Sequence, residues 1–367
     1  MKLITKLTRF SHVSLLLIGT FITSLALAQN ADDELMKEYN QRLTALENKQ
    51  KNRRLEINPS AGPKAGIFLS ADVLYLQAQE NGLEYCILFS PGPFQPVPGS
   101  VNNDLIAPDF DWDFAFRLGA GYNFKRDGWD IGLNWLHLHT DAIDRKLVGT
   151  DKVLFPVWTA PFLANPFVFN ASANLKIKLN LLDLELGRAF YVSKHLVIKP
   201  FGGLIAAWVD QDYKVEYSDS PNIFQDAHKM ENNFSGTGLV AGGRSRWFLG
   251  KSFSIYGDVL GALMYGEFQL SHDEFLTQPQ QAPIDFDFDQ KFHLTRALVN
   301  FALGLRWEEN FSQGRYRAAV QLGYEFFLFF GQNQLFRFVD SQNQGAVVSN
   351  QGDLTLQGGV FSAHFDF

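Results

Sequence analysis

Between residues 110 and 124 every even position is apolar, and the odd positions are charged, polar or small. Successive side chains of an extended strand point to opposite faces, so this period of two predicts one long strand and excludes a helix. Strands of soluble domains average about 5–6 residues, much shorter than this run. An aromatic face backed by acids, an arginine and glycines is the pattern of a strand between lipid and a polar interior. The apolar face comprises Phe110, Trp112, Phe114, Phe116, Leu118, Ala120, Tyr122 and Phe124.

The same alternation recurs downstream and predicts an all-β fold, a closed antiparallel transmembrane barrel of about ten strands. A second hairpin within residues 153–169 would raise the number to about twelve. Ala173, Leu175, Ile177, Leu179 and Leu181 would share one face up to a β-bulge at Leu181–Leu182, where the apolar positions shift by one. A short turn at Asp127-Gly128 sets the rhythm of short turns and long loops. The long loops are expected at 81–108, 141–171, 218–233, 271–290 and 331–352.

An export signal and a helical segment precede the expected barrel. Residues 1–28 join a basic start to an apolar run that ends in Ala26-Leu27-Ala28, a cleavage-site pattern. Residues 29–63 are charged and form a short periplasmic helix and linker, and residues 64–367 form the barrel. The helix carries an apolar seam of coiled-coil spacing, which either joins subunits of a homo-oligomer or belongs to a solvated tether. The seam residues are Met36, Tyr39, Leu43 and Leu46.

Composition excludes several other classes of protein. The 367 residues carry a net charge of −7 and 14% aromatic residues, which gives no support for a nucleic-acid partner. After the signal, no stretch offers the roughly 20 apolar residues of a membrane helix. A single cysteine cannot form an internal disulfide, so the fold must be stable without one. The remaining partner that the apolar face requires is the lipid of an outer membrane.

Charged residues between the apolar positions are expected to point into the barrel. Such side chains either line a wet pore and bias the passage of ions, or pair with each other and fill the interior. Both signs occur among them. The strand pattern predicts these pore-lining residues: Asp111, Asp113, Arg117, Arg244, Arg246, Asp258, Arg296, Arg306, Arg317 and Glu325.

The sequence gives no strong signal for catalysis or for a cofactor. His137 and His139 share one face of a strand, but a metal site needs three or four ligands, so no metal is expected. Outer-membrane hydrolases need a histidine and an acid at the barrel mouth. Asp141 near His139 and Asp273 beside His272 are weak candidates, because loops commonly carry such pairs. We therefore expect a protein that is not an enzyme and has no cofactor.

Two motifs resemble a known family. The segment from Gly66 to Tyr85 and the run from Trp112 to Tyr122 are similar to the major outer-membrane proteins of the Legionella type, which have relatives in chlamydia-like bacteria. The terminal Phe367 is also typical of bacterial outer-membrane barrels. The resemblance implies a pore-forming protein of the bacterial outer membrane, with adhesive roles in host-associated members. Members are cross-linked through cysteines, and Cys86 is the one candidate here for a disulfide to a second chain.

Two hypotheses about function remain open. The first is a porin-like pore through which small hydrophilic solutes or ions diffuse passively. The second is a structural or adhesive surface protein, whose long extracellular loops bind a host or envelope partner while the barrel is only an anchor. Conductance in planar bilayers distinguishes the two.

Overall fold

The computed structural model describes residues 36–47, 65–90, 102–125, 127–149, 152–159, 167–219, 224–250, 252–278, 282–311, 316–338 and 346–367. The predicted signal, residues 1–28, lies outside the described residues. The chain divides into two compact units, Met1–Pro59 and Ser60–Phe367. In the first, residues 36–47 form a helix on which all four residues of the apolar seam are exposed; whether the seam joins subunits stays a prediction. No described helix is long and apolar enough to cross a membrane.

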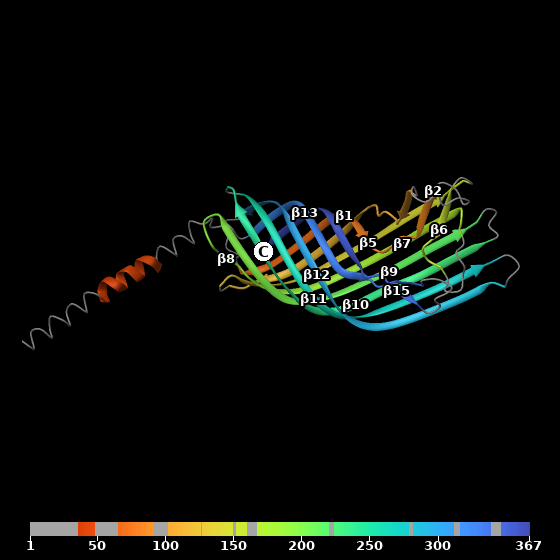
Figure 1. Cartoon of the computed structure of the whole chain (residues 1–367). Helices are drawn as coiled ribbons and strands as arrows, with labels where there is room; N and C mark the ends of the chain where they lie inside the picture. The colour runs from red at the N-terminus through yellow and green to blue at the C-terminus, as the bar shows by residue number, and fades with distance from the viewer. Residues whose placement is uncertain are drawn as a thin grey trace, which may run out of the picture. The chain divides into compact units, whose positions relative to one another are not determined.

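The second unit is a closed antiparallel barrel, as the alternation predicted. Within the described ranges ten long strands pair around it, and β9 pairs with β10 to close the ring (Figure 1). A short strand, β8 (Phe190–Tyr191), adds to the edge of β9. In order around the ring the strands are β1 (Gly66–Glu80), β4 (Trp112–Asn123), β5 (Trp129–Leu147), β7 (Asn170–Arg188), β9 (Leu196–Ser218), β10 (Gln225–Phe248), β11 (Phe253–Thr277), β12 (Ile284–Phe311), β13 (Tyr316–Asn333) and β16 (Gly352–Asp366).

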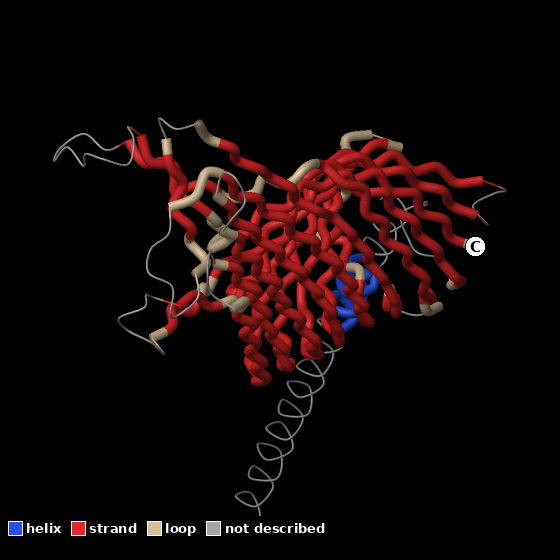
Figure 2. Tube along the Cα trace, turned by 90° about the vertical axis from the view of Figure 1, so that its right-hand side faces the viewer, coloured by secondary structure: helices blue, strands red, loops and turns tan. Residues whose placement is uncertain are grey.

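The two ends of the barrel differ. One end, here called the turn side, carries the short connections and the carboxyl terminus. Its first turn has positive φ at Asp127 (64°) and Gly128 (68°), the conformation that a two-residue hairpin turn requires. The other end, the loop side, carries the long connections, and Figure 2 shows most loops gathered away from the carboxyl terminus.

The strands reach farther into the expected loops than the sequence suggested. β5 continues to Leu147, β10 begins at Gln225, and β11 and β12 leave only a short connection between Thr277 and Ile284. The loop boundaries at 141–171, 218–233 and 271–290 were therefore wrong, whereas the loop at 331–352 agrees closely with the end of β13 at Asn333 and the start of β16 at Gly352. The polar residues that suggested loops lie on strands instead. Short strands also occupy the loop side, namely β14 (Phe336–Phe338), which pairs with β15 (Val347–Ser349).

The hairpin considered at residues 153–169 does not enlarge the barrel. β6 (Val153–Pro156) pairs instead with β2 (Cys86–Ser90), which also pairs with β3 (Asn102–Ile106). These three strands form a separate small sheet at the loop side, here called the cap (Figure 1). The alternative of twelve strands is thus not seen in the described part of the chain.

Around the turn-side half, the outer wall is an apolar band bounded by two aromatic girdles. On β10 the outward residues are apolar or small from Leu239 to Trp247, about the 9–11 residues that a tilted strand needs to cross a bilayer. We define the membrane-spanning segments as the parts of the strands between the girdles. The turn-side girdle comprises Tyr122, Trp129, Trp247, Phe253, Trp307 and Phe365, and the loop-side girdle Tyr75, Trp112, Phe114, Trp135, Trp208 and Tyr265, all exposed.

Beyond the loop-side girdle the polarity of the wall is reversed. The outer face becomes polar, with exposed Lys178, Asp210, Lys214 and Gln269, while the inner face becomes apolar. This reversal explains β7, where Leu182, Leu184 and Leu186 face outward. The alternate residues before them point inward and are buried: Ala173, Leu175, Ile177, Leu179 and Leu181. The pairing of β7 with β5 and β9 is continuous through Leu181–Leu182. The predicted bulge was wrong, because the surroundings of the strand change there and not its register.

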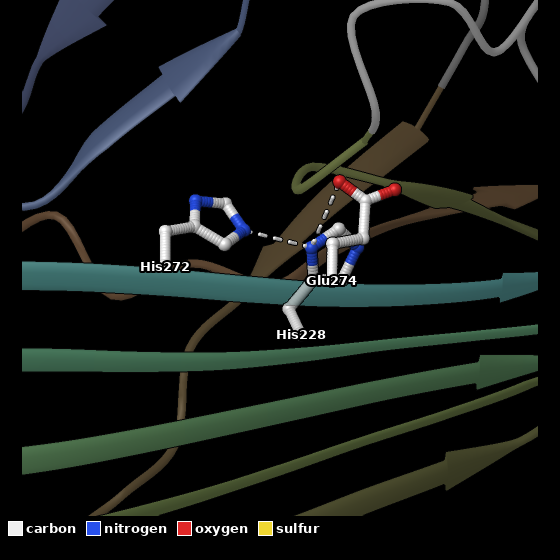
Figure 3. Close-up of side chains that lie close together, drawn as sticks. All are labelled: His228, His272 and Glu274. Carbon is white, nitrogen blue, oxygen red and sulfur yellow. Dashed lines mark hydrogen bonds and ion pairs between the residues drawn. The ribbon is translucent and has the colours of Figure 1, made fainter. Parts of the chain in front are cut away.

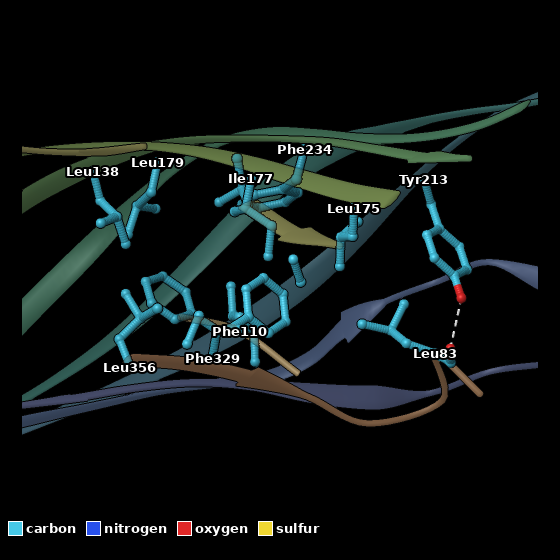
Figure 4. Close-up of a cluster of buried hydrophobic side chains, with 14 of the residues drawn as sticks. Leu83, Phe110, Leu138, Leu175, Ile177, Leu179, Tyr213, Phe234, Phe329 and Leu356 are labelled. Carbon is cyan, nitrogen blue, oxygen red and sulfur yellow. Dashed lines mark hydrogen bonds between the residues drawn. The ribbon is translucent and has the colours of Figure 1, made fainter. Parts of the chain in front are cut away.

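The inward apolar residues meet in a core that fills the loop-side half of the barrel. We call its centre the apolar plug: Leu74, Leu138, Leu175, Ile177, Leu179, Phe234, Phe329 and Leu356. Figure 4 shows Leu138, Leu179 and Ile177 on one wall facing Leu356 and Phe329 on the other. The cap packs against this core. Trp158, just after β6, is buried, and its indole Nε1 donates a hydrogen bond to the backbone oxygen of Glu84 (3.1 Å).

Candidate functional site

A cavity of about 260 Å³ lies inside the turn-side half of the barrel, at the depth of the apolar band. The alternation that turns aromatic residues toward lipid brings charged side chains to this interior. Every barrel strand except β10 contributes uncharged as well as charged lining residues, and β10 contributes Arg244 and Arg246. Leu136, Leu181 and Phe327 line the cavity where it meets the core of the loop-side half.

Arg117 connects three strands across the cavity. Its guanidinium lies 3.1 Å from Asp72 of β1, its partner in the strand register, and 2.6 Å from Glu325 of β13. Asn300 of β12 donates a further hydrogen bond to Glu325 (2.9 Å). Two carboxylates and an amide therefore fix this cation, and charge-assisted hydrogen bonds of this kind are shorter and stronger than neutral ones.

Arg244 occupies the opposite part of the cavity. It lies 2.7 Å from Glu185 of β7 and 3.9 Å from Asp258 of β11, with its guanidinium 4.5 Å from the centre of the Phe201 ring. Nearby, Lys199 of β9 lies 2.6 Å from Asp130 of β5. The pairs Arg244–Glu185 and Lys199–Asp130 each skip one strand, whereas Arg244 and Asp258 are direct partners in the register. Contacts across the lumen and pairing between neighbouring strands therefore both determine which charges meet.

A third group of charges lies nearer the turn side. Glu308 accepts hydrogen bonds from Arg246 (3.1 Å) and Arg306 (3.0 Å). Arg317 lies 2.7 Å from Asp366, whose other oxygen accepts from Asn123 (3.1 Å). The cavity is thus lined by charges of both signs, arranged as local pairs and not as one cationic or anionic ring.

The predicted inward residues fall into two groups. Asp111 is exposed and precedes β4, and Asp113 and Arg296 lie outside the cavity; the Arg296 guanidinium lies 5.0 Å from the Phe268 ring centre in the loop-side half. Strand alternation gives the face of a residue but not its depth, so it could not separate these three. Seven of the predicted residues line the cavity: Arg117, Arg244, Arg246, Asp258, Arg306, Arg317 and Glu325.

Sequence reasoning missed several residues at this level. Asp183, Glu185 and Lys199 also line the cavity. The assumed bulge obscured the face of the first two, although their alternation with Leu182, Leu184 and Leu186 was a usable signal. The sequence reasoning also missed His228 and Glu274. The register of β10 and β11 places these two residues opposite each other, beside His272.

Of the two histidine–acid pairs considered for catalysis, His272 and Asp273 do not face each other. His272 is buried whereas Asp273, its neighbour, is exposed, because adjacent residues of a strand face opposite sides. His137 and His139 are on the outer face of β5, and a ring nitrogen of His137 lies 2.9 Å from the amide oxygen of Asn180.

Cys86 is a buried free cysteine in the cap. Burial raises the pKa of its thiol to about 12, so little of the reactive thiolate forms. A disulfide to a second chain would require the cap to open, and this linkage stays a prediction.

A search of curated sequences found no match. The outer-membrane protease OmpT of Escherichia coli is 9% identical, with a TM-score of 0.35, over 84% of this chain and 99% of that one. The attachment invasion locus protein Ail of Yersinia pestis is 8% identical, with a TM-score of 0.24, over 83% of this chain and 99% of that one. The outer membrane protein OprG of Pseudomonas aeruginosa is 12% identical, with a TM-score of 0.26, over 83% of this chain and 98% of that one. Similarity this low adds nothing on function.

The sequence itself identifies the family. Residues 62–367, which include the whole barrel, match the model of the Legionella pneumophila major outer membrane protein precursor. The aromatic girdles and lipid-facing band agree with the location that this description gives. The chain therefore belongs to the Legionella major outer membrane protein family and is a β-barrel protein of the bacterial outer membrane.

Proposed function

We propose that this barrel is a narrow pore for small hydrophilic or charged solutes, closed on the loop side by the apolar plug. The observation that carries the proposal is the charged cavity at membrane depth. Its 260 Å³ is many times the roughly 10–15 Å³ that one water molecule needs, and its lining is polar enough to hold water. The proposed role is not enzymatic.

The apolar plug is the closed gate in this proposal. Hydrophobic constrictions stop ions by excluding water, without any charged barrier. A polar network adds to the closure: Gln211 of β9 donates to both oxygens of Glu80 on β1 (2.8 Å each), although these strands are not neighbours in the barrel. Opening requires that the cap and the plug separate.

Planar-bilayer recording of the purified protein tests the pore. We expect discrete, infrequent openings whose ion preference shifts toward cations in Arg244→Glu, because this residue lies in the cavity. If the ion preference of the currents is the same in Arg244→Glu as in the wild type, the currents do not pass through the cavity.

Weakening the plug is expected to increase opening. Each Leu→Ala change in a packed core costs about 2–5 kcal/mol, so Leu138→Ser with Leu356→Ser should raise the ratio of open to closed states at least about tenfold. The matched control is Gln79→Ser, a polar position exposed on the outer face of β1. Single-channel open probability measures the effect, and equal gating in both proteins would remove the plug from the mechanism.

Closure should also weaken as pH rises. Glu80 lies beyond the loop-side girdle, and burial raises its pKa to about 8. The closed state therefore binds a proton that an exposed glutamate loses near pH 4.5, so closure is most favoured below that pH and is lost progressively as pH rises through about 8. We expect open probability to rise between pH 5 and pH 8.5 in wild type and to stay flat in Glu80→Gln. A similar rise in Glu80→Gln would assign the effect to another group.

One observation favours the second hypothesis, an adhesive or structural surface protein anchored by the barrel. The loop-side half has a polar outer face and a packed apolar interior, as a soluble domain has, and it extends beyond the lipid. Silence in bilayers, both for wild type and for the double plug variant, together with binding to a host or envelope partner, would support that function and exclude the pore.

A further inference from the structure

Three potential metal ligands meet inside the loop-side half, away from the charged cavity. His228 lies on β10, and His272 and Glu274 lie on β11, all facing inward and each no more than 3% exposed. The register explains why they meet: His228 is paired directly with Glu274, and His272 is two residues away on the same face. Figure 3 shows the two imidazoles and the carboxylate pointing toward one another.

Two of the three distances are close to those of a coordination sphere, and the third pair of ligand atoms must move closer together to bind one ion. Nδ1 of His228 lies 3.1 Å from Nε2 of His272 and 3.8 Å from a carboxylate oxygen of Glu274, and one ligand atom from each residue lies within 4.8 Å of the other two. Ligands held about 2.0–2.1 Å from a tetrahedral ion are about 3.3 Å apart, a value between the two shorter distances.

A hydrogen bond between the two imidazoles would explain the first distance alone. It would leave Glu274 unexplained, because neither carboxylate oxygen has a hydrogen-bond partner among the described residues, and both are buried. A second acid, Asp226, is 1% exposed and lies 3.3 Å from Nε2 of His228. Two imidazoles and two carboxylates therefore share one site without water access, where buried ionisable groups need partners or an ion.

The surroundings of the group are aromatic. The ring centres of Phe336 and Phe338 lie 6.2 Å and 6.0 Å from that of His272, and that of Trp158 lies 6.4 Å away. Tyr217 packs against His228, with ring centres 5.8 Å apart. Such a shell excludes water and lowers the local dielectric, so an ion that neutralises the acids there gains more than it would at the surface.

We propose that His228, His272 and Glu274 bind a divalent transition metal ion of the zinc class. Two imidazole nitrogens and one carboxylate oxygen are ligands that such ions prefer, whereas Mg²⁺ and Ca²⁺ prefer oxygen alone. Asp226 is a positioning residue. Its carboxylate lies 3.3 Å from Nε2 of His228, where an acid behind a zinc-bound histidine commonly accepts the imidazole proton, and Nδ1 is the nitrogen that would bind the ion. The ion joins β10 to β11 beneath the cap and β14.

Zinc titration of the full-length protein tests the site. The protein is purified in detergent, stripped with a chelator, and titrated against a chromophoric zinc indicator, with bound metal counted by mass spectrometry. We expect one tightly held Zn²⁺ per chain. Glu274→Gln, which keeps the shape of the side chain, and His272→Ala should each weaken binding on the order of 100-fold or more, and Asp226→Asn roughly 10–100-fold.

His139→Ala is the matched control. Like His272, His139 lies in a barrel strand and has another potential metal ligand, His137, two residues away on the same face, but it is exposed on the outer wall. The control variant should bind zinc as wild type does. Heat-modifiable migration on gels verifies that each variant is folded. A second measurement needs only the wild-type protein. Co²⁺ added to it should produce the visible absorption of a low-coordinate site with nitrogen and oxygen ligands, so this test does not depend on whether a variant folds.

Two results would overturn the proposal. One is a wild-type protein that retains no zinc and shows no such cobalt spectrum. The other is zinc binding that survives Glu274→Gln and His272→Ala but is lost in His139→Ala, which would place the metal on the outer wall. Neither result bears on the pore, because these residues do not line the charged cavity.

Discussion

Phe301→Arg is expected to destabilise the barrel strongly. Phe301 faces outward from β12, is 48% exposed, and lies midway between Trp307 of the turn-side girdle and Thr295 at the loop-side limit of the band. An arginine on the lipid face near the bilayer midplane costs about 2–4 kcal/mol, a large fraction of a typical folding free energy. Urea unfolding in lipid vesicles, followed by heat-modifiable migration, measures this loss.

The neighbouring residue provides the control. Ala302 faces inward, lines the cavity, and is paired with Asp258 on one side and Glu325 on the other. Arginine at this position would lie between two carboxylates in a wet lumen, so Ala302→Arg should fold and change unfolding free energy by no more than about 1 kcal/mol. Equal loss of folding in the two variants would contradict the assignment of inner and outer faces.

Trp158→Ala is expected to detach the cap from the barrel. The buried indole packs on Tyr213 (ring centres 5.9 Å apart), Arg337 lies 5.1 Å from the indole ring centre, and the backbone N–H of Trp158 donates to the hydroxyl of Tyr217 (3.2 Å). Truncating a buried tryptophan costs about 3–5 kcal/mol. This loss applies mainly to local opening of the cap, because the ring closes independently through strand pairing.

Cys86 reports this opening. It is the one cysteine of the chain, it lies in β2 of the cap, and it is 0% exposed. Its reaction with a maleimide should be slow in wild type and on the order of 10²-fold faster or more in Trp158→Ala, the factor that the lost free energy gives. Trp247→Ala, in the turn-side girdle, should leave the rate unchanged. An unchanged rate in Trp158→Ala would mean that the cap is held by other contacts.

Much of the membrane-spanning half could be predicted from sequence. The run around Phe116 and Leu118 has a period of two, and only an extended strand puts its apolar residues on one face. Arg117 and Glu325 were assigned inward for the same reason, and both line the cavity. The partners of these charges could not be predicted, because Arg117 reaches a strand that lies 208 residues away in the chain.

The sequence by itself determined that the chain alternates, and therefore that it forms a barrel with one apolar and one polar face. Only the tertiary structure decided which face is inner at each depth. Ile177 and Leu184 belong to one continuous strand, yet one packs in the core and the other faces lipid. Likewise, His228 and Glu274 meet only through the pairing of β10 with β11. The physical reason is that alternation is a property of one strand, whereas lipid, water and core are defined by how far that strand extends relative to all the others.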